Sequence, residues 1–217
     1  MKLKGAEIVW ECLTREGVEV VFGYPGGANM PIYDAMLNYP VHHVLVRHEQ
    51  GAAHMADGYA RASGKVGVAM ATSGPGATNL VTGICTAMMD SVPTVFITGQ
   101  VAAHLIGGDA FQETDVTGIT LPITKHNYLV TRADQIAETI REAFYIARSG
   151  RPGPVLIDIC KNAQIESCEF VFPEDVKLPG YQPVLRSSKN LLDQAVDLIE
   201  RAKKPIILCG HGVLMSK

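Results

Sequence analysis

The sequence has no block of basic residues and no long apolar run. Its formal net charge is only −3 over 217 residues, so it offers no cationic surface of the kind that binds nucleic acid or anionic membranes. No apolar segment approaches the roughly 20 residues that a membrane-spanning helix needs. Residues 1–17 mix charged and apolar side chains as an amphipathic helix does, and a signal peptide does not. We therefore expect no nucleic-acid partner and no membrane association.

The sequence also lacks the cysteine and histidine patterns of metal sites and disulfide frameworks. Its five cysteines are odd in number and form no CxxC pair, which fits a reducing, cytoplasmic location better than an oxidising one. Four histidines lie between His42 and His54, but their spacing matches no HExxH pair. We expect none of these side chains to bind a metal ion.

What the sequence does contain is enough apolar material for a packed core. Hydrophobic residues make up 47% and charged residues 19%, and the length suggests one domain plus part of another. Periodicity predicts helices over residues 5–17, 49–63, 75–91 and 133–150. It predicts strands over residues 18–23, 42–48, 65–74, 92–100, 126–131 and 153–159. Alternating helices and mostly apolar strands, 42–48 among them, predict an α/β fold: an open parallel sheet with helices on both faces.

The composition changes after Ile159. Residues 161–187 hold prolines and scattered charges without a clear period, which predicts a linker between domains. A helix over 188–204 and a strand in "PIILCGHG" then predict the start of a second α/β domain. We therefore expect a first domain over 1–160, a linker over 161–187 and the truncated start of a central domain over 188–217.

Three glycine-containing turns follow predicted strands, at 23–29 ("GYPGGAN"), 72–79 ("TSGPGATN") and 98–100 ("TGQ"). Ligands of open α/β sheets gather beyond the carboxyl ends of the strands, and glycine lets a ligand approach the backbone there. Neither of the two longer turns fits GxGxxG or GxxxxGK[ST]. Any one of them could be a plain tight connection, but together they favour a binding site.

Glu49 stands where another strand ends, in "RHEQGAAH". As the first residue of a helix, Glu49 could simply carry a negative charge that interacts favourably with the helix dipole and so stabilises the helix. The glycine turns at equivalent places raise the alternative that its carboxyl group belongs to a site. The irregular stretch 100–122 supports that alternative, because loops this long in a compact domain are more often functional than not.

Several segments then become recognisable together, among them "FGYPGGANMPIYDAM", "RHEQGAAHMADGYAR" and "TSGPGATNLVTGI". In this order they closely resemble the N-terminal, pyrimidine-binding domain of thiamine-diphosphate-dependent enzymes, which has a flavodoxin-like fold. "DAFQE" followed by "TKHNYLV" narrows the resemblance to the catalytic (large) subunit of acetolactate synthase.

The resemblance implies roles for individual residues. Glu49 would hydrogen-bond a pyrimidine ring nitrogen and so help to remove the thiazolium C2 proton, a form of acid–base catalysis relayed through a cofactor. Gln112 would orient the substrate or intermediate, Phe111 and Lys125 would line the substrate channel, and Arg151 would contact FAD in flavin-containing members. The implied cofactor-binding positions are Tyr24, Pro25, Gly26, Glu49, Thr72, Pro75, Gly76, Asn79 and Arg151.

The resemblance also implies the activity of a longer protein. That protein would decarboxylate pyruvate and join the hydroxyethyl unit to pyruvate or 2-oxobutyrate in branched-chain amino acid biosynthesis. It would use thiamine diphosphate, Mg²⁺ and FAD, with the Mg²⁺ site and most FAD contacts outside this chain. The active site would lie between subunits of a homo-oligomer, a dimer or tetramer, which a small regulatory subunit could join. The 217-residue chain alone would be inactive.

Four alternatives stay open at this point. A thiamine-dependent 2-oxoacid decarboxylase or oxidase would keep the cofactor and change the reaction. A non-catalytic nucleotide-binding module would use the same fold. A regulatory subunit is a further alternative, but it would not need the acid at Glu49. Members of the family often show "PKD" after the last strand, where this sequence has Cys160-Lys161-Asn162; that difference leaves a related carboligase open.

Overall fold

The computed structural model describes residues 1–184 and 186–216 and divides the chain into two compact units, Met1–Gln182 and Pro183–Lys217. Leu185 of the predicted linker and Lys217 of the predicted second domain lie outside the described residues. Each unit is described by itself below.

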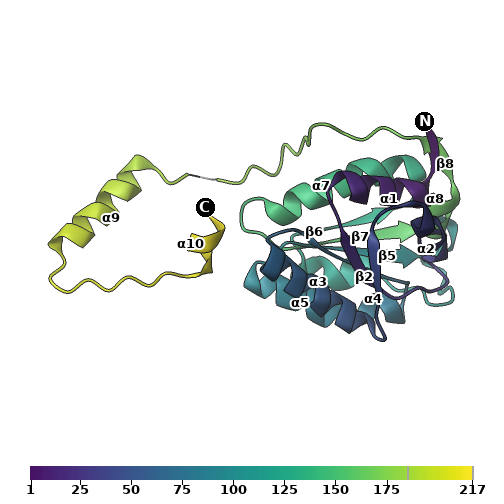
Figure 1. Ribbon diagram of the computed structural model, residues 1–217, viewed down its shortest axis with the longest axis horizontal. Coiled ribbons are helices and arrows are strands. Elements are labelled where there is room, and N and C mark those ends of the chain that lie inside the picture. The colour runs from purple at the N-terminus through teal and green to yellow at the C-terminus, as the bar shows by residue number, and fades with distance from the viewer. Residues whose placement is uncertain (185, 217) are drawn as a thin grey trace. The chain divides into compact units, whose positions relative to one another are not determined.

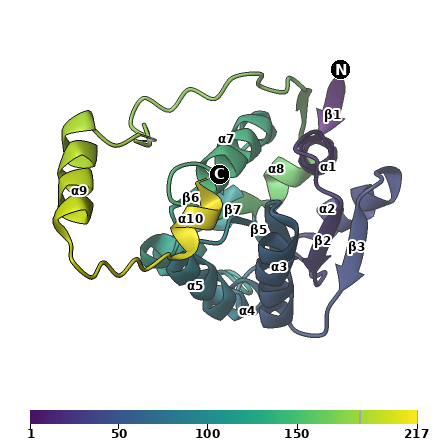
Figure 2. The same cartoon turned by 60° about the vertical axis from the view of Figure 1, so that its left-hand side comes forward.

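The first unit is built on a six-stranded parallel sheet (Figures 1 and 2). Its strands are β2 (Val20–Gly23), β3 (His42–Leu45), β4 (Gly67–Ala71), β5 (Thr94–Gln100), β6 (His126–Val130) and β7 (Pro154–Cys160). They lie in the order β3-β2-β4-β5-β7-β6, and every neighbouring pair is parallel. The predicted fold class, an open parallel sheet with helices on both faces, is confirmed.

Helices cover both faces of this sheet, as Figure 1 shows. One core cluster joins the sheet to α1 (Gly5–Arg15), α2 (Met30–Ala35), α7 (Ile136–Arg148) and α8 (Lys161–Ile165). The other joins it to α3 (Glu49–Ser63), α4 (Pro75–Asn79), α5 (Val81–Asp90) and α6 (Val116–Thr120). Val95 and Ile97 face the first cluster and Phe96 the second, because side chains alternate along a strand. Both faces are therefore buried, which explains why β4, β5 and β7 consist mostly of apolar residues.

Short helical turns and a small second sheet complete the first unit. Single 3₁₀ turns are η1 (Met36–Asn38), η2 (Ala103–Leu105), η3 (Leu121–Ile123) and η4 (Ala133–Gln135). β1 (Lys2–Lys4) pairs antiparallel with β8 (Ser167–Glu169). Within the residues described, no helix has the length and apolar character needed to cross a membrane.

The α3 helix has clear signals at both ends. Glu49 is its first residue, and the Nδ1 atom of His48 accepts a hydrogen bond of 3.1 Å from the backbone N–H of Gln50. Gly64 follows Ser63 with φ of 71°, the left-handed conformation that commonly ends a helix. The predicted bounds of this helix, 49–63, are confirmed.

The order of strands reverses at β2. This strand pairs with β3 on one side and with β4 on the other, so the chain leaves β2 in one direction and returns to its other side. In doubly wound folds, ligands bind at the carboxyl ends of strands at such a switch point. The turn after β2 and the turn after β4 both lie there.

Three expectations about the sheet and its helices were wrong. The strand at residues 42–48 is not buried: β3 is an edge strand, and Leu45 is 63% exposed. The helix expected over 75–91 is two helices that meet at Leu80, where α4 ends and α5 begins. "TGQ" is not a turn, because residues 98–100 are buried in β5.

The region after β7 also differs from expectation. Residues 161–182 belong to the first compact unit, and they contain α8 and β8 although their sequence has no clear period. In the second unit, the expected helix forms as α9 (Lys189–Arg201) and is followed by α10 (His211–Met215). The expected strand in "PIILCGHG" is absent from described residues 205–212, because a strand needs a neighbour to satisfy its backbone groups.

The packing of α5 against α3 gives a test of the fold. A Cβ on Gly83 of α5 would lie 2.3 Å from the Cβ of Ala53 in α3. We expect Gly83→Ala to lower the free energy of unfolding by about 1–3 kcal/mol, because the two helices must move apart. Urea unfolding, followed through the fluorescence of buried Trp10, measures this change.

Gly58, inside α3, is the matched control, because a Cβ there meets open space. Gly58→Ala should be neutral or stabilise by about 0.5–1 kcal/mol through helix propensity. Equal destabilisation by both substitutions would contradict the close packing of α3 and α5.

Candidate functional site

The turn after β2 docks on Thr72, which follows β4. The backbone N–H of Ala28 donates to Thr72 Oγ1 at 3.1 Å, and the N–H of Tyr24 donates to the carbonyl oxygen of Met70 at 3.2 Å. A Cβ on Gly26 would lie 2.5 Å from the Cβ of Thr72. Glycine at position 26 therefore lets the two turns meet at the switch point.

Glu49 lies against the second of these turns. Its Oε2 accepts a hydrogen bond of 2.9 Å from Asn79 Nδ2, and it is only 9% exposed. A Cβ on Gly76 would lie 3.3 Å from Glu49 Oε1 and 2.7 Å from Thr72 Cγ2. The structure thus brings Gly26, Thr72, Gly76, Asn79 and Glu49 together from three separate segments of the chain.

The environment of Glu49 suits a carboxylate that holds a ligand proton. Within the described residues, its side chain makes one hydrogen bond, to a neutral amide, and no ion pair. Burial and, secondly, the charge of Glu49 raise the pKa of the nearby Tyr33 hydroxyl, so Tyr33 stays neutral beside it. A nearly buried carboxylate interacts more strongly with a ligand N–H than an exposed one does.

The long loop after β5 forms one wall of a cavity at the same edge of the sheet. Its volume is about 280 Å³, and it is lined by Gly27, Ala28, Ser73, Val101, Ala102, Leu105, Phe111, Gln112 and Lys161. The backbone of Gln112 has φ of 58°. It packs closely on Gly74, because a Cβ on Gly74 would lie 2.6 Å from the backbone carbonyl oxygen of Gln112. The Phe111 side chain is 87% exposed. Phe111 and Gln112 therefore lie beside the turn that carries Gly76.

An internal clamp gives this loop its shape. Both oxygens of Glu113 accept hydrogen bonds from backbone N–H groups of the loop, those of Gly107 and, at 2.9 Å, Ala110. These bonds hold the pKa of the Glu113 carboxyl below its usual range. The loop is thus organised by its own carboxylate.

A buried polar network supports the loop from inside the sheet. Asp158 of β7 accepts hydrogen bonds from Thr98 Oγ1 at 2.6 Å and from Gln100 Nε2 at 2.8 Å. The same Gln100 amide donates to the carbonyl oxygen of Thr114 at 2.9 Å. Burial raises the pKa of Asp158 to about 6, although the two hydrogen bonds oppose the shift. This network links the carboxyl ends of β5 and β7 to the loop.

Lys125 and Arg151 do not join Glu49. Lys125 precedes β6, and its Nζ donates to the Ser149 oxygen at 2.8 Å, to the Tyr181 hydroxyl at 2.9 Å and to the carbonyl of Ile146. Arg151 precedes β7, and its Nε donates to Ser91 Oγ at 2.7 Å. Since both precede strands, they lie at the amino edge of the sheet. The structure separates these residues from the other predicted positions.

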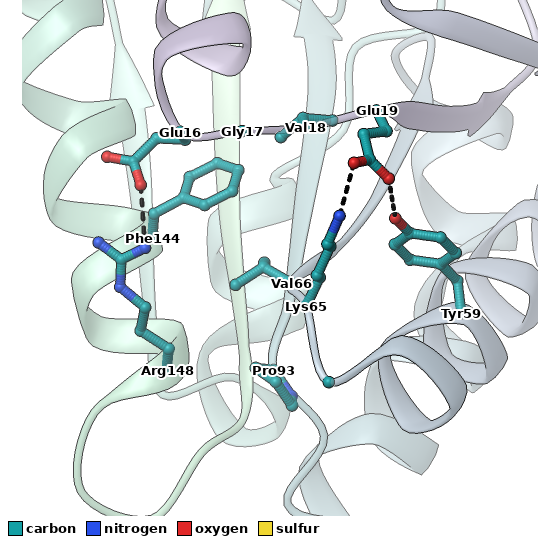
Figure 3. Close-up of a pocket in the computed structure, with 11 residues that line it drawn as sticks. Glu16, Gly17, Val18, Glu19, Tyr59, Lys65, Val66, Pro93, Phe144 and Arg148 are labelled. Atoms are coloured by element: carbon teal, nitrogen blue, oxygen red, sulfur yellow. Dashed lines mark hydrogen bonds and ion pairs between the residues drawn. The ribbon is translucent and has the colours of Figure 1, made fainter.

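A second cavity, of about 460 Å³, lies at the amino edge (Figure 3). Its charged side chains pair with one another: Glu16 with Arg148 at 3.1 Å, and Glu19 with Lys65 at 2.6 Å. Tyr59 also donates to Glu19. The two edges of the sheet therefore differ, because the carboxyl edge keeps an acid beside neutral amides and glycines.

Sequence reasoning assigned no role to three residues of the carboxyl edge. Asp158 and Gln100 carry the buried network, and Lys161 lines the cavity with Phe111. An available signal for Asp158 was an acidic residue inside an apolar strand, since buried charges occur only where they are paired or hydrogen-bonded. For Lys161 and Gln100, the available signal was their position in the sequence, because each lies at the carboxyl end of a predicted strand.

Comparisons with known proteins show what the chain is similar to. Residues 3–119 match the family described as "Thiamine pyrophosphate enzyme, N-terminal TPP binding domain". The chain is 52% identical to the "Acetolactate synthase large subunit" of Corynebacterium glutamicum, with 99% of this chain and 34% of that protein aligned.

Two further relatives show the same pattern. The "Acetolactate synthase large subunit" of Haemophilus influenzae is 51% identical, with 100% of this chain and 38% of that protein aligned. The "Probable acetolactate synthase large subunit" of Methanocaldococcus jannaschii is 52% identical, with 99% and 37% aligned. The chain thus spans about a third of the length of these relatives.

Asp158 predicts a pH dependence of stability. Its pKa of about 6 in the native state lies above the value of about 3.9 for an unfolded aspartate. The native state then binds this proton more tightly, so the stabilisation is full below pH ~4 and is lost as the pH rises through ~6.

Asp158→Asn removes this titration. We expect the free energy of unfolding of the variant, relative to the parent, to increase by roughly 2–3 kcal/mol between pH 4 and pH 7. Urea unfolding of both proteins at the two pH values measures the change. A difference that stays constant over this range would show that Asp158 does not titrate near pH 6.

Proposed function

The chain belongs to the thiamine pyrophosphate enzymes, whose N-terminal TPP binding domain it carries, and from this premise we propose that it is the N-terminal part of an acetolactate synthase large subunit. Residues 1–160 would form the pyrimidine-binding domain, and residues 161–182 belong to the same compact unit. Residues 188–217 would form the start of a central domain. The observation that carries the proposal is the position of Glu49, nearly buried against the glycine turn at 74–76.

The residues around Glu49 fit the aminopyrimidine half of thiamine diphosphate. That ring has nitrogens and an exocyclic amine, so it needs an acceptor or donor in a site that admits a flat group. Glu49 Oε1 is an acceptor beside Gly76, and Gly26 opposes it across Thr72. The groups proposed to hold the ring are Tyr24, Pro25, Gly26, Glu49, Thr72, Pro75, Gly76 and Asn79.

Glu49 would hold a proton between its carboxyl oxygen and a ring nitrogen. Asn79 keeps the carboxylate in place by donating to Oε2, which leaves Oε1 for the ligand. When bound, thiamine diphosphate supplies a thiazolium carbon that acts as the nucleophile toward a 2-oxo acid. The uncharged turns around Glu49 would keep water away from the shared proton, and this exclusion of water strengthens the hydrogen bond between Glu49 and the ring.

The proposed reaction is the decarboxylation of pyruvate and the joining of its two-carbon unit to pyruvate or 2-oxobutyrate, as in branched-chain amino acid biosynthesis. The names of the relatives support this choice. Gln112, at the wall of the cavity of about 280 Å³, would orient the substrate, and Phe111 would line its path.

The same carboxyl edge supports an assembly of subunits. Phe111 is 87% and Tyr24 43% exposed, and apolar side chains so placed beside a site are typical of a surface that another domain covers. We propose a homo-oligomer whose active site lies between this edge and a partner subunit. Parts of the longer protein outside this chain would bind Mg²⁺ and most of FAD, and Arg151 would contribute a contact to FAD. Lys125 would line the substrate channel together with such parts.

Glu49→Gln tests the central role. The amide keeps the shape of the side chain but cannot share a proton with a ring nitrogen in the same way. In the full-length protein, we expect exchange of the cofactor's C2 proton for deuterium to slow by at least about 100-fold. Quenched exchange followed by NMR of the released cofactor measures this rate.

Glu19→Gln is the matched control. It makes the same substitution at the amino edge of the sheet, where Glu19 pairs with Lys65. Its exchange rate should equal that of the parent protein. Exchange at the parent rate in Glu49→Gln as well would remove the basis of the proposed function.

Product analysis separates the proposed activity from a related one. We expect the full-length protein to convert pyruvate into 2-acetolactate and CO₂, and the 217-residue chain to form no product. Acetaldehyde or acetyl phosphate as the main product would instead identify a decarboxylase or an oxidase. Carboligation by the isolated chain would contradict an active site shared between domains.

A further inference from the structure

Gln164 of α8 ties the end of β7 to the turn after β2. It is fully buried, and its Nε2 donates to the carbonyl oxygens of Ala28 at 2.8 Å and Ile159 at 2.9 Å. A buried amide is costly unless its hydrogens are bonded, so both bonds contribute to the placement of the turn. The side chain thus reaches from a segment that looked like a linker to the turn that carries Gly26.

Both backbone polar groups of Ala28, its N–H and its carbonyl oxygen, are hydrogen-bonded to side chains. Its N–H donates to Thr72 Oγ1 at 3.1 Å, while its carbonyl accepts from Gln164. Its oxygen also lies so close to β5 that a Cβ on Gly99 would be 2.5 Å away. The turn therefore has one position that satisfies β4, β5 and α8 together.

Asn162 makes the equivalent contact with the long loop. Its Oδ1 accepts from the backbone N–H of Ala103 at 2.9 Å, and its Nδ2 donates to the carbonyl of Thr131 at 2.8 Å and to Glu166 Oε1 at 2.9 Å. Ala103 begins η2 in the loop that leads to Phe111. Through Asn162, α8 is thereby bonded to the long loop and to the residue that follows β6.

Both segments bonded to α8 line the cavity at the carboxyl edge. Ala28 and Ala102 lie on its walls, and Lys161 of α8 lines it too. We propose that α8 is a clamp that fixes the turn 24–29 and the loop 101–105 relative to each other, with Gln164 and Asn162 as positioning residues. This inference rests on the proposed function, in which the turn holds the cofactor and the loop carries Gln112.

Gln164→Glu tests the clamp in the full-length protein. A carboxylate would present oxygen to two carbonyl oxygens and lose both hydrogen bonds, at nearly unchanged volume. We expect amide hydrogen exchange of residues 24–29, measured without cofactor, to become about tenfold faster or more. We also expect the half-saturating concentration of thiamine diphosphate to rise about tenfold, with kcat at saturation within about twofold of the parent.

Gln164→Met keeps the side-chain volume without the buried charge, so it carries the test if Gln164→Glu fails to fold. Gln182→Glu, at an exposed position, is the control and should change neither quantity. For the second contact, Asn162→Leu should speed exchange at Ala103 more than Asn162→Asp, which keeps an acceptor for that N–H.

The outcomes separate the clamp from the proposed function. Unchanged exchange of residues 24–29 in Gln164→Met would overturn the clamp. Faster exchange with an unchanged cofactor requirement would overturn its positioning role. Failure of the proposed function would show instead as normal C2 exchange in Glu49→Gln, whatever the amide exchange of the turn.

Discussion

The carboxyl edge of the sheet depends on how closely the backbone can approach Thr72. Positions 26 and 76 both carry glycine because a Cβ at either would lie 2.7 Å or less from an atom of the Thr72 side chain. The Thr72 hydroxyl in turn accepts the N–H of Ala28. The turn after β2 and the start of the helix after β4 are thereby held around one small side chain, and Glu49, the first residue of α3, lies beside Gly76 and Asn79 of that helix. Steric contact explains the glycines here, and Glu49 gains its shielded position from it.

Polar groups of two kinds organise the two edges of the same sheet. At the amino edge, carboxylates pair with arginine and lysine, as Glu16 and Glu19 do. At the carboxyl edge, Glu49 and Asp158 are bonded to neutral amides and hydroxyls instead. A carboxylate without a cationic partner keeps its capacity to share a proton with a ligand, and burial raises the pKa of Asp158, so that this residue also binds its own proton more tightly. The proposed function therefore places the chemistry at the carboxyl edge, where Glu49 and Asp158 have no cationic partner among the described residues.

Local patterns predicted much of this structure, and tertiary contacts decided the rest. The bounds of α3, its end at Gly64 and the buried strands β4, β5 and β7 follow from periodicity and apolar composition. The exposure of β3 does not, because edge and central strands of similar composition look alike in sequence. A helix as short as α8 has little stability of its own and forms through contacts such as those of Gln164. The motif positions at the carboxyl edge came together as expected, whereas Lys125 and Arg151, which precede strands, lie at the other edge.

The central claim is that Glu49 receives the pyrimidine ring of thiamine diphosphate between the turns at 24–29 and 72–79. A crystal structure of the full-length protein with the cofactor bound tests it most directly. The account predicts a carboxyl oxygen of Glu49 within roughly 2.6–3.2 Å of a pyrimidine ring nitrogen, with Asn79 still bonded to the other oxygen. A pyrimidine ring bound elsewhere, with Glu49 contacting only Asn79, would contradict it.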